Sequence, residues 1–151
     1  DKLRLSLADA AERLDLARLS MHGEIVVERR PPQQRMGKAM VAPAPGGFLQ
    51  ATVTGEETIA SLVLAALPKG KRVADLFSGC GPIAFRLAER MQVHAVESDK
   101  AAVLALTRAA SITQGLKPIA TETRDLFRRP LLEHELKPLD AVVLDPPRAG
   151  A

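Results

Sequence analysis

Aromatic residues and cysteine are scarce in this chain of 151 residues, which has four Phe, one Cys and neither Trp nor Tyr. Proteins that bind single-stranded nucleic acid by base stacking need a row of aromatic side chains, and this composition argues against such a platform. A single cysteine excludes both a disulfide framework and a metal site built from several cysteines. His22, His94 and His134 stand far apart and match no metal-ligand spacing, so we predict no metal site.

Long apolar runs are also absent. No stretch approaches the length of a membrane span, and the N-terminal residues are charged rather than arranged as a signal peptide. We therefore expect a cytoplasmic protein with no membrane partner, and nothing indicates a protein partner. The net charge of +3 is mildly basic, and basic residues gather in 28–35 and 124–130. Charge alone leaves open whether these are solvated loops or a phosphate-facing patch.

The N-terminal part of the chain differs in pattern from the rest. Apolar residues at helical spacing predict a helix over 6–19, with Ser6 and Asp9 as its capping pair. Residues 23–30 and 38–43 are predicted to form two short strands, joined by a segment rich in Pro and Gln. We predict a small helix-plus-hairpin segment that contains no active site and ends a preceding domain.

From residue 46 onward the pattern alternates between strands and helices. Strands are predicted at 72–77, 93–97, 118–124 and 141–145, and helices at 54–67, 81–91, 99–115 and 131–136. In the first helix, Thr54 and Glu57 have capping-box spacing. Its expected buried face consists of Ile59, Leu62, Val63 and Ala66. Strands that alternate with helices form parallel crossover units, so we predict an α/β sheet covered on both faces.

Each of the four predicted strands ends near an acidic residue. These acids are Asp75, Glu97, Asp125 and Asp145. Ligands of such sheets bind outside the carboxyl ends of the strands, which lie at one edge. We therefore expect the four carboxylates to line a binding site, although each one alone could also serve as a helix N-cap.

The glycine-rich loop after the first strand is compatible with two kinds of cofactor. Residues 79–84, GCGPIA, match the Gly-x-Gly-x-x-Ala fingerprint of nicotinamide-dependent oxidoreductases, with Glu97 at about the position of the ribose-binding acid. Asp75, however, ends the strand ahead of this loop, and a carboxylate there would repel a pyrophosphate. It suits the ammonium group of S-adenosylmethionine, which carries no phosphate, and Gly79 and Gly81 would let the backbone approach that ligand. We prefer methyl transfer.

Cys80 lies between the two glycines of this loop, where a small residue is needed. No His or Lys stands nearby in the sequence to lower the pKa of its thiol. We interpret it as a structural residue rather than a nucleophile.

Five motifs follow one another along the chain: GGFLQ, VADLFSGCGPIAFRLAE, VHAVESD, RDLF and VVLDPPRAGA. In this order and spacing they resemble the RNA uracil-5 methyltransferase family, whose members methylate C5 of a specific uridine in tRNA or ribosomal RNA. The resemblance covers about residues 46–151 and implies the N-terminal part of a Rossmann-like class I methyltransferase domain. Residues 1–45 resemble the end of the family's central RNA-binding region. S-adenosylmethionine is the implied cofactor and RNA the implied partner.

The resemblance also implies residues of the cofactor pocket. Those that match the family's motifs are Gln50, Phe77, Pro82, Glu97, Asp125 and Asp145. Asp75, Gly79 and Gly81 complete the predicted site from the strand-end and loop arguments above. The chain departs from the family at Pro82, where many members have a small polar residue, and at Thr52, where an asparagine is common. Pro146 and Pro147 hold the loop after Asp145 rigid and extended, and Arg148 orients that loop or meets RNA phosphate.

No catalytic residue is expected within this sequence. In the family, a cysteine adds to C6 of uracil and a general base removes the C5 proton, and both follow the D-P-P-R motif. The resemblance therefore implies a longer enzyme, of which this chain is a truncated part with the first four parallel strands and no activity of its own. Two alternatives remain: an amino-nitrogen methyltransferase, which has an aromatic residue where Arg148 stands, and a noncatalytic cofactor-binding module.

Overall fold

Four parallel strands form the centre of the protein. The computed structural model describes residues 2–148. The central strands are β5 (Arg72–Leu76), β6 (Gln92–Glu97), β7 (Ile119–Thr123) and β8 (Ala141–Leu144). They pair in the order β7-β6-β5-β8, and all three pairings are parallel. The predicted parallel α/β sheet is confirmed, and the carboxyl ends of its strands meet at one edge.

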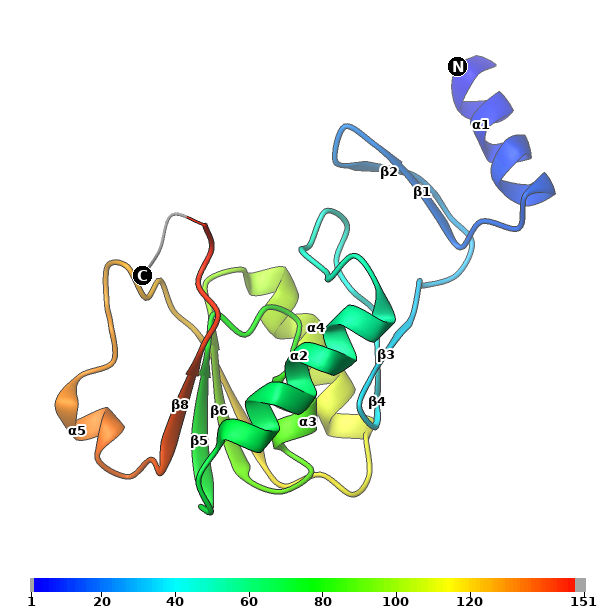
Figure 1. Ribbon diagram of the computed structural model, residues 1–151. Coiled ribbons are helices and arrows are strands. Elements are labelled where there is room, and N and C mark those ends of the chain that lie inside the picture. Colours follow the sequence, from blue (N-terminus) through cyan, green and yellow to red (C-terminus); the bar gives the residue numbers. More distant parts are fainter. Residues whose placement is uncertain (1, 149–151) are drawn as a thin grey trace.

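The two faces of the sheet are covered unequally. Helices α2 (Val53–Ala66), α3 (Ala84–Leu87) and α4 (Lys100–Ile112) lie on one face, and the short α5 (Glu133–Leu136) lies on the other (Figure 1). On the second face, Val142 and Leu144 of β8 are 44% and 53% exposed. The prediction of helical cover on both faces is therefore right for one face only. On the other, Leu126, Leu131 and Leu139 from the loops around α5 pack against Ala74, Leu76 and Val96.

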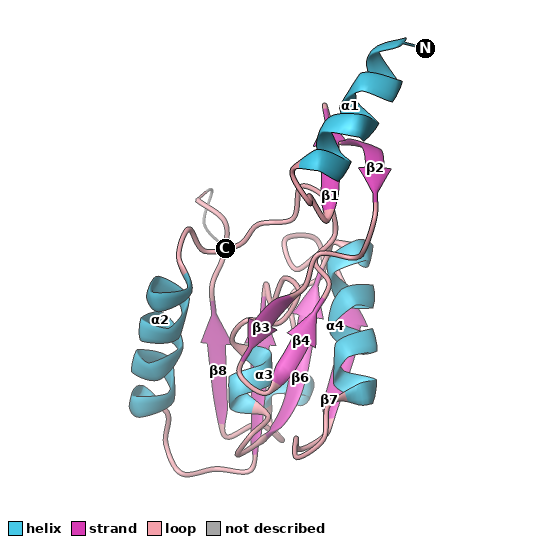
Figure 2. Ribbon diagram, turned by 90° about the vertical axis from the view of Figure 1, so that its right-hand side faces the viewer, coloured by secondary structure: helices cyan, strands magenta, loops and turns pink. Residues whose placement is uncertain are grey.

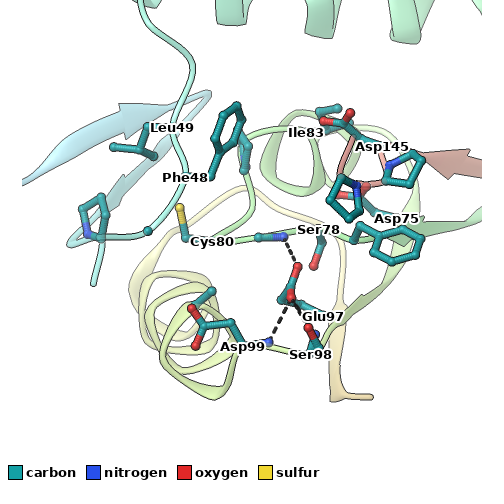
Figure 3. A pocket seen from close by; sticks show the side chains of 18 of the residues that line it. Phe48, Leu49, Asp75, Ser78, Cys80, Ile83, Glu97, Ser98, Asp99 and Asp145 are labelled. Atoms are coloured by element: carbon teal, nitrogen blue, oxygen red, sulfur yellow. Dashed lines mark hydrogen bonds between the residues drawn. The ribbon is translucent and has the colours of Figure 1, made fainter. Parts of the chain in front are cut away.

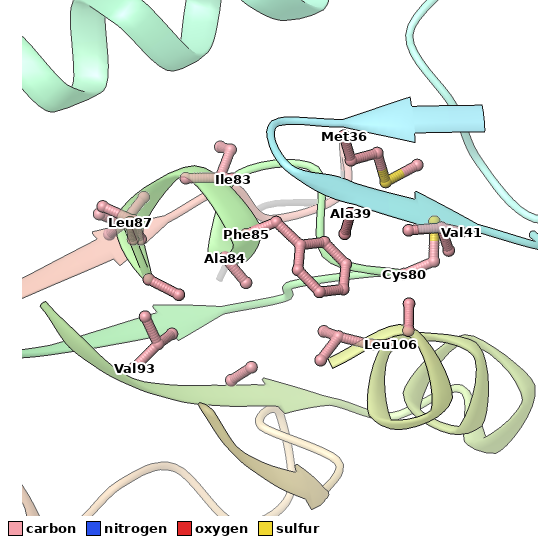
Figure 4. Packing of buried hydrophobic residues seen from close by; sticks show 14 of the residues in the cluster. Met36, Ala39, Val41, Cys80, Ile83, Ala84, Phe85, Leu87, Val93 and Leu106 are labelled. Carbon is pink, nitrogen blue, oxygen red and sulfur yellow. The ribbon is translucent and has the colours of Figure 1, made fainter. Parts of the chain in front are cut away.

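The main core lies between the sheet and a hairpin from the N-terminal part of the chain. This hairpin consists of β3 (Gln34–Met36) and β4 (Ala39–Val41). Met36 and Val41 are fully buried, and Figure 4 shows them on the same side of the Phe85 ring, with Leu106 of α4 nearby. The hairpin thus packs as part of the α/β unit, although it precedes residue 46.

The remaining N-terminal elements lie apart from the sheet (Figures 1 and 2). They are α1 (Lys2–Arg13), β1 (Arg18–Met21) and β2 (Glu24–Glu28). The sequence predicted one hairpin formed by 23–30 and 38–43, and this is wrong: β1 pairs with β2, and β3 pairs with β4. The reason is the turn at His22 and Gly23, whose φ angles of 53° and 83° suit a two-residue hairpin connection.

Two predicted helix caps are also wrong. Ser6 lies inside α1, where its hydroxyl donates a hydrogen bond to the carbonyl of Lys2. The N-cap of helix α2 lies two residues earlier than predicted, because Thr52 rather than Thr54 takes this position and accepts a hydrogen bond from the Gly55 N–H. Helix α4 has Asp99 as its N-cap, and the Asp99 carboxylate accepts a hydrogen bond from the Ala101 N–H.

The buried face of α2 differs from the predicted one. Ile59 and Leu62 are 39% and 66% exposed, whereas Glu56 and Ala60 are buried. The hydrophobic pattern was misleading here because Glu56 turns inward to form an ion pair with Arg86.

Helix α3 occupies only part of the predicted 81–91. It ends early because the carbonyl of Ala88 accepts a hydrogen bond from the Lys117 N–H instead of extending the helix. None of the helices within residues 2–148 is long and apolar enough to span a lipid bilayer.

Candidate functional site

A cavity of about 810 Å³ opens at the carboxyl ends of the central strands (Figure 3). Its volume is in the range of small-molecule and cofactor sites. Three loops contribute to its walls: residues 47–50 before α2, the glycine loop 77–83 after β5, and residues 145–148 after β8. Seven of the nine predicted site residues line it, namely Gln50, Asp75, Phe77, Gly79, Pro82, Glu97 and Asp145.

The other two predicted residues have structural roles next to the cavity. Gly81 packs against the core side chains below the glycine loop, where an added Cβ would lie 2.8 Å from the Phe85 ring. The Asp125 carboxylate accepts hydrogen bonds from the N–H groups of Phe127 and Arg128 and so caps its own turn. The structure does not bring the Asp125 side chain to the cavity wall, and a contact between it and a cofactor stays a prediction.

Asp75 is the most deeply buried charged group of the cavity. It is 1% exposed, and its Oδ2 has no hydrogen-bond partner among the described residues. Burial, followed by the nearby charges of Asp145 and Glu97, raises the pKa of the Asp75 carboxyl to about 7. A hydrogen bond from the Ala84 backbone partly opposes this rise in pKa. A buried carboxyl oxygen without a partner is costly, so Oδ2 is available to a ligand that donates a hydrogen bond or carries positive charge.

Glu97 ends β6 and is held firmly by its surroundings. Its Oε1 accepts hydrogen bonds from the Ser98 N–H, the Ser98 hydroxyl and the Asp99 N–H. Its Oε2 accepts one, from the Gly79 N–H at 3.0 Å (Figure 3). A carboxylate oxygen has two lone pairs, so Oε2 keeps one for a ligand hydroxyl. The same side chain ties the glycine loop to the end of β6.

The glycine loop leaves β5 through unusual backbone angles. Phe77 has a φ of 61°, a left-handed conformation that bulky residues rarely adopt. Gly79 and Gly81 follow with φ angles of 54° and 99°, which glycine adopts without strain. Strain at a non-glycine residue persists only where neighbouring structure enforces it, and it is often found at functional sites.

Phe127 was not predicted as a site residue, although it belongs to the RDLF motif. Its ring lies beside that of Phe77, with the centroids 5.4 Å apart, and both rings line the cavity. Arg124 fixes this loop: its guanidinium binds the carboxylate of Glu135 at 2.6 Å and lowers the pKa of Glu135 to about 2. It also donates hydrogen bonds to the carbonyls of Arg129 and Pro130.

Cys80 also lines the cavity but is poorly suited to attack. The residue is 6% exposed, and burial raises the pKa of its thiol to about 11. A thiol of that pKa is almost entirely protonated near pH 7, and the thiolate is the nucleophilic form.

The charges around the cavity define the ligands it suits. The acids that line it are Asp75, Glu97, Asp99 and Asp145, and the one basic side chain in its described lining is Arg148. This arrangement disfavours a pyrophosphate and suits a ligand with an ammonium group and hydroxyl groups. Phe77 and Phe127 add an apolar wall for a flat or aliphatic part of such a ligand.

Solved methyltransferase structures share the fold of this chain. No protein-family model matches the chain. A solved tRNA (uracil-54, C5)-methyltransferase of Pyrococcus abyssi, in complex with S-adenosyl-L-homocysteine, shares the fold with a TM-score of 0.67 and 23% identity. The match covers 82% of this chain and 30% of that one. A tRNA m1G37 methyltransferase of M. jannaschii has a TM-score of 0.53 at 15% identity, over 68% of this chain and 33% of its own. The fold is that of Rossmann-like methyltransferases.

Relatives in sequence carry the name RNA methyltransferase. A protein of Brucella suis named an uncharacterized RNA methyltransferase is 56% identical over 151 residues, all of this chain and 36% of the relative. A protein of Caulobacter vibrioides with the same name is 46% identical over 148 residues, 98% of this chain and 36% of its own. The 23S rRNA (uracil(1939)-C(5))-methyltransferase of Chromohalobacter salexigens is 34% identical over 110 residues, 71% of this chain and 22% of its own.

The chain is therefore similar in sequence to one part of these longer proteins, which are named RNA methyltransferases. It spans about a third of the length of the first two relatives, with 36% of each covered.

Proposed function

We propose that this chain forms the cofactor-binding part of an S-adenosylmethionine-dependent RNA methyltransferase. The observation that carries the proposal is the buried Asp75 carboxyl, whose Oδ2 has no partner, at the base of an acid-lined cavity. The relatives named RNA methyltransferases support the reaction class and RNA as the substrate.

The residues present fit this cofactor. Asp75 and Asp145 would hold its ammonium group, and the free lone pair on Glu97 Oε2 would accept a ribose hydroxyl. The rings of Phe77 and Phe127 offer an apolar wall to its flat base. The bound cofactor supplies an electrophilic methyl group on a sulfonium. The chain's own side chains would bind the cofactor and fix its orientation within the cavity.

Within this class we propose C5 of a uridine as the methylated atom. The D-P-P-R-A-G-A ending of the chain supports it, as do the names of two proteins reported above, which specify C5 of uracil. Arg148 also stands where amino-nitrogen methyltransferases carry an aromatic residue. The choice between tRNA and ribosomal RNA is left to experiment, because the two named proteins act on different RNAs.

Calorimetry with S-adenosyl-L-homocysteine tests the cofactor assignment. In the whole protein, Glu97→Ala should weaken binding by about 1–3 kcal/mol, roughly 5- to 150-fold, because a hydrogen bond to a charged group is lost and the glycine loop is released. Equal affinity in the two proteins would refute the ribose contact, and tight binding of NADH instead would favour an oxidoreductase.

RNA that contains 5-fluorouridine tests the methylated atom. A cysteine that adds to C6 should leave a stable covalent adduct, because fluorine at C5 cannot depart as a proton does. Mass spectrometry of the whole protein should detect it in the presence of S-adenosylmethionine. Methylated amino groups in the product RNA without any adduct would instead establish amino-nitrogen methylation.

A further inference from the structure

A buried ion pair joins two walls of the cavity. Glu56, in the first turn of α2, is 4% exposed, and its Oε1 lies 2.9 Å from Nη1 of Arg86 on α3, whose side chain is 11% exposed. Neither residue lines the cavity. Each follows a loop that does: α2 follows residues 47–50, and α3 follows the glycine loop.

Both members of the pair are anchored further. The same Nη1 of Arg86 donates a hydrogen bond to the carbonyl of Pro82, at 2.5 Å, within the glycine loop. The Oε2 of Glu56 accepts a hydrogen bond from the side-chain amide of Gln34 on β3, at 3.2 Å. A continuous chain of polar contacts thus runs from hairpin β3–β4 through α2 to the cavity wall at Pro82.

A gain in folding stability alone does not account for the burial of the Glu56–Arg86 ion pair. Taking two charges out of water is costly, and a buried ion pair is often no more stabilising than two apolar side chains of similar size. The contact between Glu56 Oε1 and Arg86 is an ion pair without hydrogen-bond geometry, because Oε1 has no hydrogen-bond partner among the described residues. The pair nevertheless sets the distance between α2 and the glycine loop, since the same Nη1 of Arg86 lies against the Glu56 carboxylate and donates to the Pro82 carbonyl.

We propose that Glu56 and Arg86 are positioning residues, which hold the loop at 47–50 and the glycine loop at the separation that cofactor binding requires. This proposal rests on the proposed function. It concerns neither the methylated atom nor any group that touches the cofactor.

The test compares Glu56→Gln with Asp140→Asn in the whole protein. Asp140 accepts hydrogen bonds from the N–H groups of Lys71 and Arg72, at 2.6 and 2.9 Å, where β5 begins and thus at the opposite end of the sheet from the cavity. Both variants should lower the Tm. Only Glu56→Gln should raise the Kd for S-adenosyl-L-homocysteine, by tenfold or more, and raise KM for the methyl donor while kcat changes less than threefold.

A milder variant keeps the test decisive if Glu56→Gln does not fold. Gln34→Leu removes one anchor of Glu56 and leaves the ion pair itself in place, and it should raise the Kd about threefold. The proposal would be overturned if neither Glu56→Gln nor Gln34→Leu, where folded, changed the affinity for S-adenosyl-L-homocysteine. It would also be overturned if Asp140→Asn lost as much affinity as these variants do. If the unmodified protein itself does not bind S-adenosyl-L-homocysteine, the proposed function fails first, and the positioning role fails with it.

Discussion

The buried side chain of Asp75 destabilises the folded protein when its carboxyl is ionised. Its carboxyl is buried next to two other acids, and its pKa is raised to about 7. A positively charged ligand group would favour the ionised form, so binding near neutral pH should release a proton. The residue is thus suited to a bound state rather than to the free protein.

The raised pKa of Asp75 predicts how stability depends on pH. The pKa of this carboxyl is near 3.8 in the unfolded chain and higher in the folded one. Folding therefore favours the protonated form, and this contribution to stability is fully present below pH 3.8. This contribution is lost as pH rises toward 7. At pH 8, Asp75→Asn should therefore be more stable than wild type, with a free energy of unfolding larger by on the order of a few kcal/mol. Its Tm should be higher accordingly. Thermal melts from pH 5 to 8 measure this.

Asp140→Asn provides a control variant, whose stability at pH 8 should change in the opposite direction. Hydrogen bonds from the Lys71 and Arg72 N–H groups lower the pKa of Asp140, so its contribution is present above the usual carboxyl pKa and lost as pH falls. Its Asn variant should be less stable than wild type at pH 8. A fall in the Tm of Asp75→Asn at pH 8 would contradict the burial argument.

Cys80 is predicted to be dispensable. Cys80→Ser keeps the small size of the side chain in the glycine loop, so methyl transfer by the whole protein should stay within a few-fold of wild type. The adduct with 5-fluorouridine RNA should form as in wild type. Loss of the adduct with cofactor binding intact would identify Cys80 as the nucleophile.

At the scale of elements, the glycine loop depends on two glycines for different reasons. A Cβ on Gly81 would lie 2.8 Å from the Phe85 ring and 2.9 Å from the Leu106 side chain, at a φ of 99°. A Cβ on Gly79 would meet nothing within 4 Å, at a φ of 54° that alanine tolerates with modest strain.

Gly81→Ala should therefore destabilise the fold by about 3 kcal/mol or more, and Gly79→Ala by about 1–2 kcal/mol. Denaturant unfolding of the two variants side by side measures the difference. Equal losses of stability would show that backbone strain, rather than the packing of Phe85 and Leu106, sets the requirement for glycine.

At the scale of the whole molecule, cofactor binding should stabilise the fold. A ligand that binds only the folded state at 100 times its Kd adds about 2.7 kcal/mol to the free energy of unfolding. S-adenosyl-L-homocysteine should raise the Tm of the whole protein, whereas NADH at the same concentration should not. A rise with NADH alone would support the oxidoreductase alternative.

The sequence determined the parallel sheet and most of the cavity. Strands β5, β6, β7 and β8 were predictable because their apolar runs alternate with helical periods, and the crossover rule then makes them parallel. The strand-end position of Asp75, Glu97 and Asp145 followed from the same rule, since parallel strands end at one edge.

Three features became apparent only in the folded protein: the pairing of the N-terminal strands, the buried face of α2 and the place of Asp125. The His22–Gly23 turn pairs β1 with its neighbour in sequence, which leaves β3–β4 to pack on Phe85. Glu56 is buried because Arg86, 30 positions later in the chain, neutralises it. Local periodicity carries no information about a partner so distant in sequence, so hydrophobicity alone placed Val63 correctly against the core but missed the burial of Glu56.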